Sequence, residues 1–193
     1  MLPARPLDKL LTVSTTLVTI TGPIASGKNT IASALADRCA EDGLSVVIAD
    51  VDDVAAMVSG SGAAAGGLWF AAHEAHGALV AQWVQSEVDL VISVGPIYSQ
   101  AEQYALYGRL TDTQPLRVVV DAPLAVTWSR VRDDHTRRLS RDREFHFAAH
   151  ARFRSLMPGI PSDITVDSAE MSADEIADLL YAAVGDRLST NKE

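Results

Sequence analysis

The chain is poor in cysteine and has no long hydrophobic run. Cys39 is the single cysteine among 193 residues, which excludes an intramolecular disulfide and a cysteine-rich metal site. No apolar stretch approaches the length that crosses a bilayer. Near the start of the chain, Leu10 and Leu11 form too short a segment to be the core of a signal peptide. These absences predict a cytoplasmic protein without a membrane span.

Positive charge is also scarce. The formal net charge is −9, and no lysine or arginine occurs between Arg38 and Arg109. Nucleic-acid binding depends on a basic surface, so we expect no nucleic-acid partner. The length is that of one domain with a full core.

Two glycines, Gly22 and Gly27, stand directly after the apolar segment Leu17–Ile20 at the spacing of a known motif. Residues 22–30 read Gly-Pro-Ile-Ala-Ser-Gly-Lys-Asn-Thr, which matches the phosphate-binding P-loop, Gly-x-x-x-x-Gly-Lys. In this motif backbone N–H groups point at phosphate oxygens, Lys28 reaches the outer phosphates, and the next helix presents its positive end. A plain strand-to-helix turn is the alternative. Asn29 departs from the motif, which has a magnesium-binding Ser or Thr at this position.

Arginine is dense in one window, residues 130–154. The window holds eight arginines and four acids and carries a net +4, against −13 for the rest of the chain. Together with a P-loop, it suggests a second set of phosphate contacts. For Arg132, Arg143 and Arg152, a solvated helix face with ion pairs is an equally good interpretation.

Short Val- and Ile-rich segments alternate with helical patterns, which predicts an α/β fold with a parallel sheet covered on both faces. The expected strands are 17–21, 45–50, 89–94, 116–121 and 163–167. The expected helices are 28–42, 68–87, 98–110, 124–134, 144–156 and 172–187, the last beginning with the capping box Ser172-Ala-Asp-Glu175. Residues 59–67 are too rich in glycine for either element. They predict a mobile loop beside the site or a surface insertion.

Ligands of open parallel sheets bind beyond the carboxyl ends of the strands. In this chain three carboxylates, Asp50, Asp52 and Asp53, stand at the end of the second predicted strand. Asp50 and Asp52 alternate along the end of the second predicted strand and can share a face. One could hold Mg²⁺, and the other could orient a hydroxyl or accept its proton. Helix capping is the alternative, and we assign that role to Asp53, ahead of a helix beginning at Val54.

The third predicted strand is followed by Gly95, where a substrate could approach the backbone, although a turn explains this glycine nearly as well. Tyr98, Trp69, His73 and His76 could line a substrate pocket, with packing as their default role. The two histidines lack a convincing third ligand, so we expect no zinc site.

With these motifs the chain resembles the shikimate kinase-like P-loop kinases, within the nucleoside-monophosphate-kinase-like fold. The resemblance covers about residues 16–187, and the P-loop is its one highly specific motif. It implies a three-layer P-loop fold with a five-stranded parallel sheet in the order 2-3-1-4-5 and an arginine-rich lid at about 133–145. Residues 1–15 would be an N-terminal extension and residues 188–193 a C-terminal tail.

The resemblance also implies roles for single residues. Asp50 would lie near Mg²⁺, while Asp52 would contact the substrate hydroxyl and act as base. Arg130 would stack on adenine. Arg138, or in another register Arg137, would hold phosphate from the lid.

On the substrate side, the resemblance implies contacts from Gly95 and, late in the helix after the lid, from Arg154, with Arg152 as the alternative. Two departures qualify this. Asn29 replaces the magnesium-binding hydroxyl, although an amide oxygen can ligate Mg²⁺. The carboxylate-binding arginine expected soon after Asp52 is missing, which argues against shikimate and favours a neutral or cationic hydroxyl compound.

The sequence therefore predicts an ATP- and Mg²⁺-dependent kinase that phosphorylates a hydroxyl of a small metabolite or antibiotic-like compound. The alternatives are a nucleotide-binding regulatory protein or ATPase with little kinase activity, and a nucleoside or nucleotide kinase. The predicted catalytic residues are Lys28, Asp52 and Arg138. The predicted ATP ligands are Gly22, Ala25, Ser26, Gly27, Lys28, Asn29, Thr30, Arg130 and Arg138, the substrate ligands Asp52, Gly95, Tyr98 and Arg154, and the metal ligands Asn29 and Asp50. The oligomeric state is left open.

Overall fold

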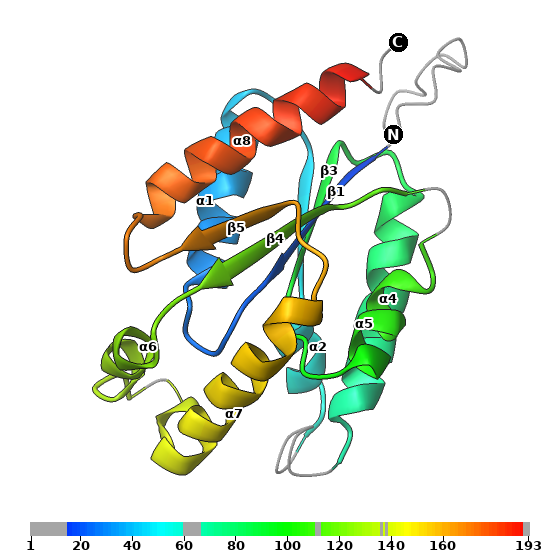
Figure 1. Cartoon of the computed structure of the whole chain (residues 1–193). Helices are drawn as coiled ribbons and strands as arrows, with labels where there is room; N and C mark the ends of the chain where they lie inside the picture. Colours follow the sequence, from blue (N-terminus) through cyan, green and yellow to red (C-terminus); the bar gives the residue numbers. More distant parts are fainter. Residues whose placement is uncertain (1–14, 60–66, 111–112, 136, 138, 191–193) are drawn as a thin grey trace, which may run out of the picture.

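A parallel sheet with helices on both faces forms the centre of the computed structural model (Figure 1), which describes residues 15–59, 67–110, 113–135, 137 and 139–190. Within these residues the strand order is β2-β3-β1-β4-β5, and all pairings are parallel. The strands are β1 (Thr16–Thr21), β2 (Val46–Asp50), β3 (Leu90–Val94), β4 (Leu116–Asp121) and β5 (Ile164–Asp167). The three-layer fold and the strand order predicted above are confirmed.

Helices cover the sheet in two groups (Figure 1). One face carries α1 (Lys28–Glu41) and α8 (Ala173–Thr190). The other carries α4 (Trp69–Val84) and α5 (Gln100–Tyr107), with the short α2 (Val51–Ala56) packed on α4. Near the carboxyl ends of the strands lie α6 (Leu124–Val131), α7 (Arg143–Leu156) and the short turns η1 (Leu139–Arg141) and η2 (Met157–Gly159).

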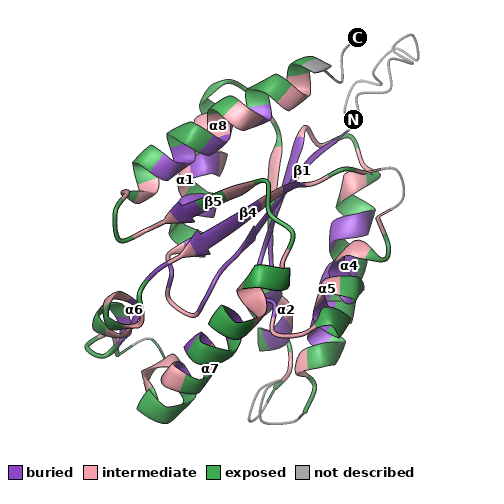
Figure 2. Cartoon of the chain, in the orientation of Figure 1, coloured by how far each residue is buried: buried purple, intermediate pink, exposed green. Residues whose placement is uncertain are grey.

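The core follows from the two-residue period of the strands. Along β1, Leu17 packs with Val80 of α4, whereas its neighbour Val18 joins the cluster that contains Leu35 of α1 and Leu180 of α8. Every residue of β1 and β3 is buried, while the edge strands β2 and β5 are partly exposed (Figure 2). The sheet therefore holds its central strand ends, including the end of β1, in fixed positions.

Two predicted helix starts can be compared with the structure. The capping box is confirmed, because the Glu175 N–H donates to Ser172 Oγ at 3.2 Å and the Ser172 N–H donates to Glu175 Oε2 at 2.8 Å. The cap assigned to Asp53 is wrong. Helix α2 begins at Val51 without a linker, so Asp50 is its N-cap.

Some predicted features lie outside the described residues. These are residues 1–14 of the N-terminal extension, 60–66 of the glycine-rich segment, 136 and 138 of the expected lid, and 191–193 of the tail. In the described part of the chain, no helix combines the length and apolar character of a membrane span.

Candidate active site

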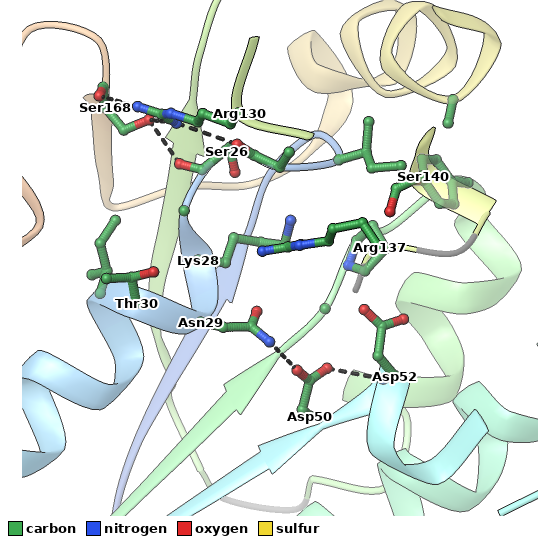
Figure 3. Close-up of a pocket in the computed structure, with 18 of the residues that line it drawn as sticks. Ser26, Lys28, Asn29, Thr30, Asp50, Asp52, Arg130, Arg137, Ser140 and Ser168 are labelled. Atoms are coloured by element: carbon green, nitrogen blue, oxygen red, sulfur yellow. Dashed lines mark hydrogen bonds between the residues drawn. The ribbon is translucent and has the colours of Figure 1, made fainter. Parts of the chain in front are cut away.

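A cavity of about 810 Å³ lies at the carboxyl ends of the strands, where the sequence places the candidate residues. Its walls come from the P-loop, the ends of β2 and β3, the η1 turn and one side of α7. Figure 3 shows Arg130, Ser26 and Ser168 on one side of this cavity and Asp52 on the other, with Lys28 and Arg137 between them. The parallel sheet thus gathers residues that are far apart in the sequence.

The P-loop backbone needs glycine at two positions. A Cβ atom on Gly22 would lie 2.1 Å from the Val120 carbonyl oxygen, so only glycine fits against β4. Gly27 has a φ of +94°, which favours glycine. Gly27 is also the N-cap of α1, and no side chain caps this helix. Its first N–H groups are therefore available to an anion, as the motif predicts.

Lys28 is buried beneath this loop. Its Nζ donates to the carbonyl oxygens of Gly22 at 3.1 Å and Pro23 at 2.8 Å. Burial lowers the pKa of the Lys28 amine to about 8, although the charges of Asp52 and Asp50 oppose this shift. Bound phosphates would favour the charged amine.

Asn29, the departure from the motif, contacts the end of β2. Its Nδ2 donates to Asp50 Oδ2 at 2.5 Å, and Asp50 Oδ1 accepts the Asp52 N–H at 2.9 Å. The donor must be the amide nitrogen because a carboxylate only accepts, which leaves Asn29 Oδ1 as a possible ligand. An amide oxygen and a neighbouring carboxylate are donors that suit Mg²⁺, so Asn29 and Asp50 fit the predicted metal role.

Asp52 faces the cavity from the first turn of α2. Asp52 is exposed to solvent in the cavity, yet the surrounding walls raise the pKa of its carboxyl, mainly by desolvation and next by the charge of Asp50. Lys28 and Arg137 lower this pKa in turn, so both cations lie within electrostatic range. A carboxylate with a raised pKa, beside a phosphate site, suits proton acceptance.

Arg130 is held by a residue that sequence reasoning did not single out. Its Nη1 donates to Ser168 Oγ at 3.0 Å and to the Ala25 carbonyl at 3.2 Å, and its Nη2 donates to the Ser168 carbonyl at 2.7 Å. Ser168 Oγ donates to the Ser26 carbonyl at 2.7 Å. These bonds lie in the guanidinium plane and leave its face for a flat ligand. The sequence offers one indication of this role: Ser168 directly follows β5, at the edge of the sheet where ligands bind.

The opposite wall contains Gly95, Tyr98 and the unpredicted Glu102. Glu102 Oε2 accepts the Tyr98 N–H at 2.5 Å, and burial raises the pKa of the Glu102 carboxyl. A Cβ on Gly95 would lie 2.5 Å from Val51 Cγ1. Packing against α2 therefore requires this glycine, a reason that neither substrate approach nor a turn, the two predicted explanations, includes.

No protein-family model matches the chain, and no curated protein matches it. Solved structures do. A tunicamycin resistance protein from Deinococcus radiodurans has a TM-score of 0.61 at 17% identity, with 89% of this chain and 96% of that chain covered. Shikimate kinase from Acinetobacter baumannii, in complex with shikimate, has a TM-score of 0.59 at 16% identity, with coverage of 91% and 96%. The Mycobacterium tuberculosis APS kinase, in complex with AMPPNP and APS, has a TM-score of 0.62 at 15% identity, with coverage of 90% and 98%.

The chain has the fold of the small P-loop kinases. The predicted resemblance to the shikimate kinase-like group is thereby confirmed at the level of the fold. Identities this low carry the fold alone, so the chemistry must be argued from the residues of this chain.

Within this P-loop kinase fold, Arg154 is not brought to the cavity. Its Nη1 forms an ion pair with Asp121 at the end of β4. Arg152, the alternative, does line the cavity, and its Nε donates to the Tyr98 carbonyl at 3.1 Å. Two positions along an α-helix turn a side chain by more than half a circle, so the two arginines face different surroundings.

Both histidines of α4 are packing residues. His76 Nε2 lies 3.0 Å from the Ala49 carbonyl oxygen, and the His73 ring meets Trp69 edge-on at 5.1 Å. Burial lowers the pKa of both imidazoles, that of His73 to about 4. Among the described residues, no group of three or more His, Cys, Asp or Glu side chains is arranged to hold a metal ion.

Proposed function

We propose that this protein transfers the γ-phosphoryl group of ATP to a hydroxyl of a small molecule. The observation that carries the proposal is the joint placement of Lys28 and Asp52 in one cavity at the strand ends. Lys28 supplies a charge for phosphate, and Asp52 supplies a carboxylate whose raised pKa suits it to take a proton.

The phosphates of ATP would lie on the uncapped N-terminus of α1, and Lys28 would contact the γ-phosphoryl group that is transferred. The adenine ring would stack on the guanidinium of Arg130. Arg137 lines the same cavity and adds positive charge, the role that the sequence assigned to Arg138, which lies outside the described residues. Mg²⁺, held by Asn29 and Asp50, would neutralise phosphate charge when bound.

Asp52 would orient the acceptor hydroxyl. In the transfer, the hydroxyl oxygen forms a bond to the γ-phosphorus while the bond between that phosphorus and the β–γ bridging oxygen breaks. The hydroxyl proton passes to Asp52, and ADP and a phosphomonoester are the products. The contribution of the protein is positioning and charge neutralisation, which is what this reaction mainly needs.

A nucleotide-binding protein with little kinase activity is the second candidate. The contacts of Asp50 favour it, because its Oδ2 accepts from Asn29 Nδ2 and its Oδ1 accepts from the Asp52 N–H, so both oxygens of this expected metal ligand are engaged. A nucleotide kinase is not favoured. A second nucleotide would need phosphate-binding cations between Asp53 and Gln100, and the sequence has none there.

Replacing Asp52 by asparagine separates the first two candidates. ADP formation is followed by a coupled assay on a panel of hydroxyl compounds, and the compound that stimulates it most is used for the variants. We expect Asp52→Asn to lower kcat by about 10²–10⁴-fold, the range typical of a lost general base. Asp53→Asn is the matched control, because Asp53 is exposed on the same helix and does not line the cavity. Unchanged turnover in Asp52→Asn would refute the proposed role of this carboxylate.

A further inference from the structure

The cavity has two ends of different chemistry. The phosphate end contains Lys28 and Arg137, and Arg130 lies beyond them, where the adenine of ATP would bind (Figure 3). The other end, here called the acceptor end, is lined by residues of α2, α4, α5, α7 and the segment between β3 and α5. They are Asp52, Trp69, Tyr98, Glu102 and Arg152.

Charge at the acceptor end is dominated by carboxylates. The whole stretch from the end of α1 to Arg109 has no lysine or arginine, so four of these five elements, all except α7, cannot supply a cation. Among the described residues of this end, Arg152 is the one cation, and it arrives from α7. Its Nε already donates to the Tyr98 carbonyl, and its charge lowers the pKa of Glu102, so it is close to that carboxylate. An anionic group at this end would meet two carboxylates, Asp52 and Glu102, and one cation, Arg152, whose charge already acts on Glu102.

Helix capping does not explain the charge of Glu102. The Glu102 N–H donates to Ser99 Oγ at 3.2 Å, and Glu102 Oε2 accepts the Tyr98 N–H, so the pair forms a capping arrangement at the start of α5. Glutamine can fill the same position in such a box, and it would avoid burying a charge. Glu102 is only 6% exposed. A buried carboxylate on a cavity wall is favoured where a ligand donates a hydrogen bond to it.

The remaining walls are apolar and held in place. Trp69 meets the buried His73 ring edge-on and packs with Ala55 and Ala72, so its indole is fixed. Phe145 lines the cavity from α7, on another wall. Such surfaces favour a flat or ring-shaped hydrocarbon body, since aromatic side chains contribute large contact areas.

We propose that the acceptor is an alcohol with an apolar, ring-like body and no anionic group, either neutral or positively charged. Its hydroxyl lies at Asp52, and a hydroxyl or ammonium donor on the same molecule bonds to Glu102. This inference rests on the proposed function for the role of Asp52. It excludes hydroxy acids, sugar phosphates and nucleotides as acceptors.

Three probes with one carbon frame and different charge test the proposal: 1-phenyl-1,2-ethanediol, 2-amino-1-phenylethanol and mandelate. Binding of each to the full chain is measured by calorimetry or ligand-observed NMR in the presence of ADP and Mg²⁺. We expect the diol and the amine to bind and mandelate to bind at least about tenfold more weakly, because two carboxylates and one cation line this end of the cavity. Glu102→Gln should weaken binding of the amine about tenfold and change the affinity for the diol by less than about threefold, because only the amine loses a charged partner.

Glu74→Gln is the control, because it removes the same charge from the exposed face of α4. The proposal is wrong if mandelate binds as tightly as the amine, if none of the three probes binds, or if Glu102→Gln and Glu74→Gln behave alike. Its failure is distinguishable from failure of the kinase proposal. Charge-selective binding without any phosphorylated product would refute only the kinase, whereas turnover of an anionic acceptor would refute only the acceptor class.

Discussion

Asn29 is the residue at which this P-loop departs from the common pattern, and its contact explains how the departure is accommodated. The amide reaches Asp50 across the gap between α1 and β2, a span of 2.5 Å between Nδ2 and Oδ2. Asp50 at the same time caps α2. The side chain thus joins the P-loop to the strand that carries Asp52.

Restoring the hydroxyl should strengthen the effect of magnesium. In Asn29→Thr the hydroxyl becomes a Mg²⁺ ligand and Asp50 loses its amide partner, so its carboxylate is free for the metal and its waters. We expect Mg²⁺ to improve ADP affinity by about tenfold more in this variant than in the natural chain, with metal-free affinity within about threefold. Calorimetric titration of ADP with and without Mg²⁺ measures both quantities. If Mg²⁺ improves ADP affinity equally in the two proteins, Asn29 is as good a magnesium ligand as threonine and the prediction is wrong.

The pKa of Lys28 predicts proton uptake on nucleotide binding. In the free protein this pKa is about 8, against an ordinary value of 10.5, so the amine loses its proton as the pH rises through 8. Bound phosphates favour the charged form, and the complex should regain the proton. At about pH 8.5 we expect uptake of about three-quarters of a proton per ADP, and at about pH 7 close to none.

Titration in two buffers of different ionisation enthalpy gives this proton count. Lys28→Arg is the control, since guanidinium stays charged over this range and should show no uptake. The same uptake in both proteins would assign the proton to another group.

At the scale of elements, the capping box at the start of α8 fixes the segment that follows Ser168. Removing the hydroxyl in Ser172→Ala leaves the Glu175 N–H without its partner. We expect a loss of about 1 kcal/mol in the free energy of unfolding, measured by urea denaturation. Ser189→Ala, near the other end of the same helix, should change stability by less than about 0.5 kcal/mol. Equal losses in both variants would mean that the cap adds nothing beyond general helix propensity.

Sequence patterns predicted the elements well because apolar strands and helices repeat with different periods. They were less informative about contacts between elements. The cap at Asp50 was missed because α2 follows β2 without a linker, and no pattern marks a helix of six residues. Arg152 and Arg154 could not be separated, because the side of α7 that faces the cavity depends on tertiary packing. Gly95 is required by Val51, a neighbour only in space.

At the scale of the whole molecule, the arginine-dense window divides into individual roles. Arg130, Arg137 and Arg152 line the cavity. Others match the alternative of surface contacts: Arg132 pairs with Asp133 at 3.0 Å, and the guanidinium of Arg143 lies 5.2 Å from the centre of the Phe147 ring. Positive charge is thus concentrated at the strand ends of an acidic protein, where it can attract a polyphosphate.

Transfer of labelled phosphate tests the central claim most directly. The protein is incubated with Mg²⁺, ATP labelled in the γ-phosphate, and a mixture of neutral and cationic alcohols, and mass spectrometry then detects labelled phosphomonoesters. We predict one labelled product class that forms with the natural chain and with Asp53→Asn, and that falls by at least about 10²-fold in Asp52→Asn. Tight ATP binding with no labelled product from any alcohol would contradict phosphoryl transfer and leave a nucleotide-binding protein.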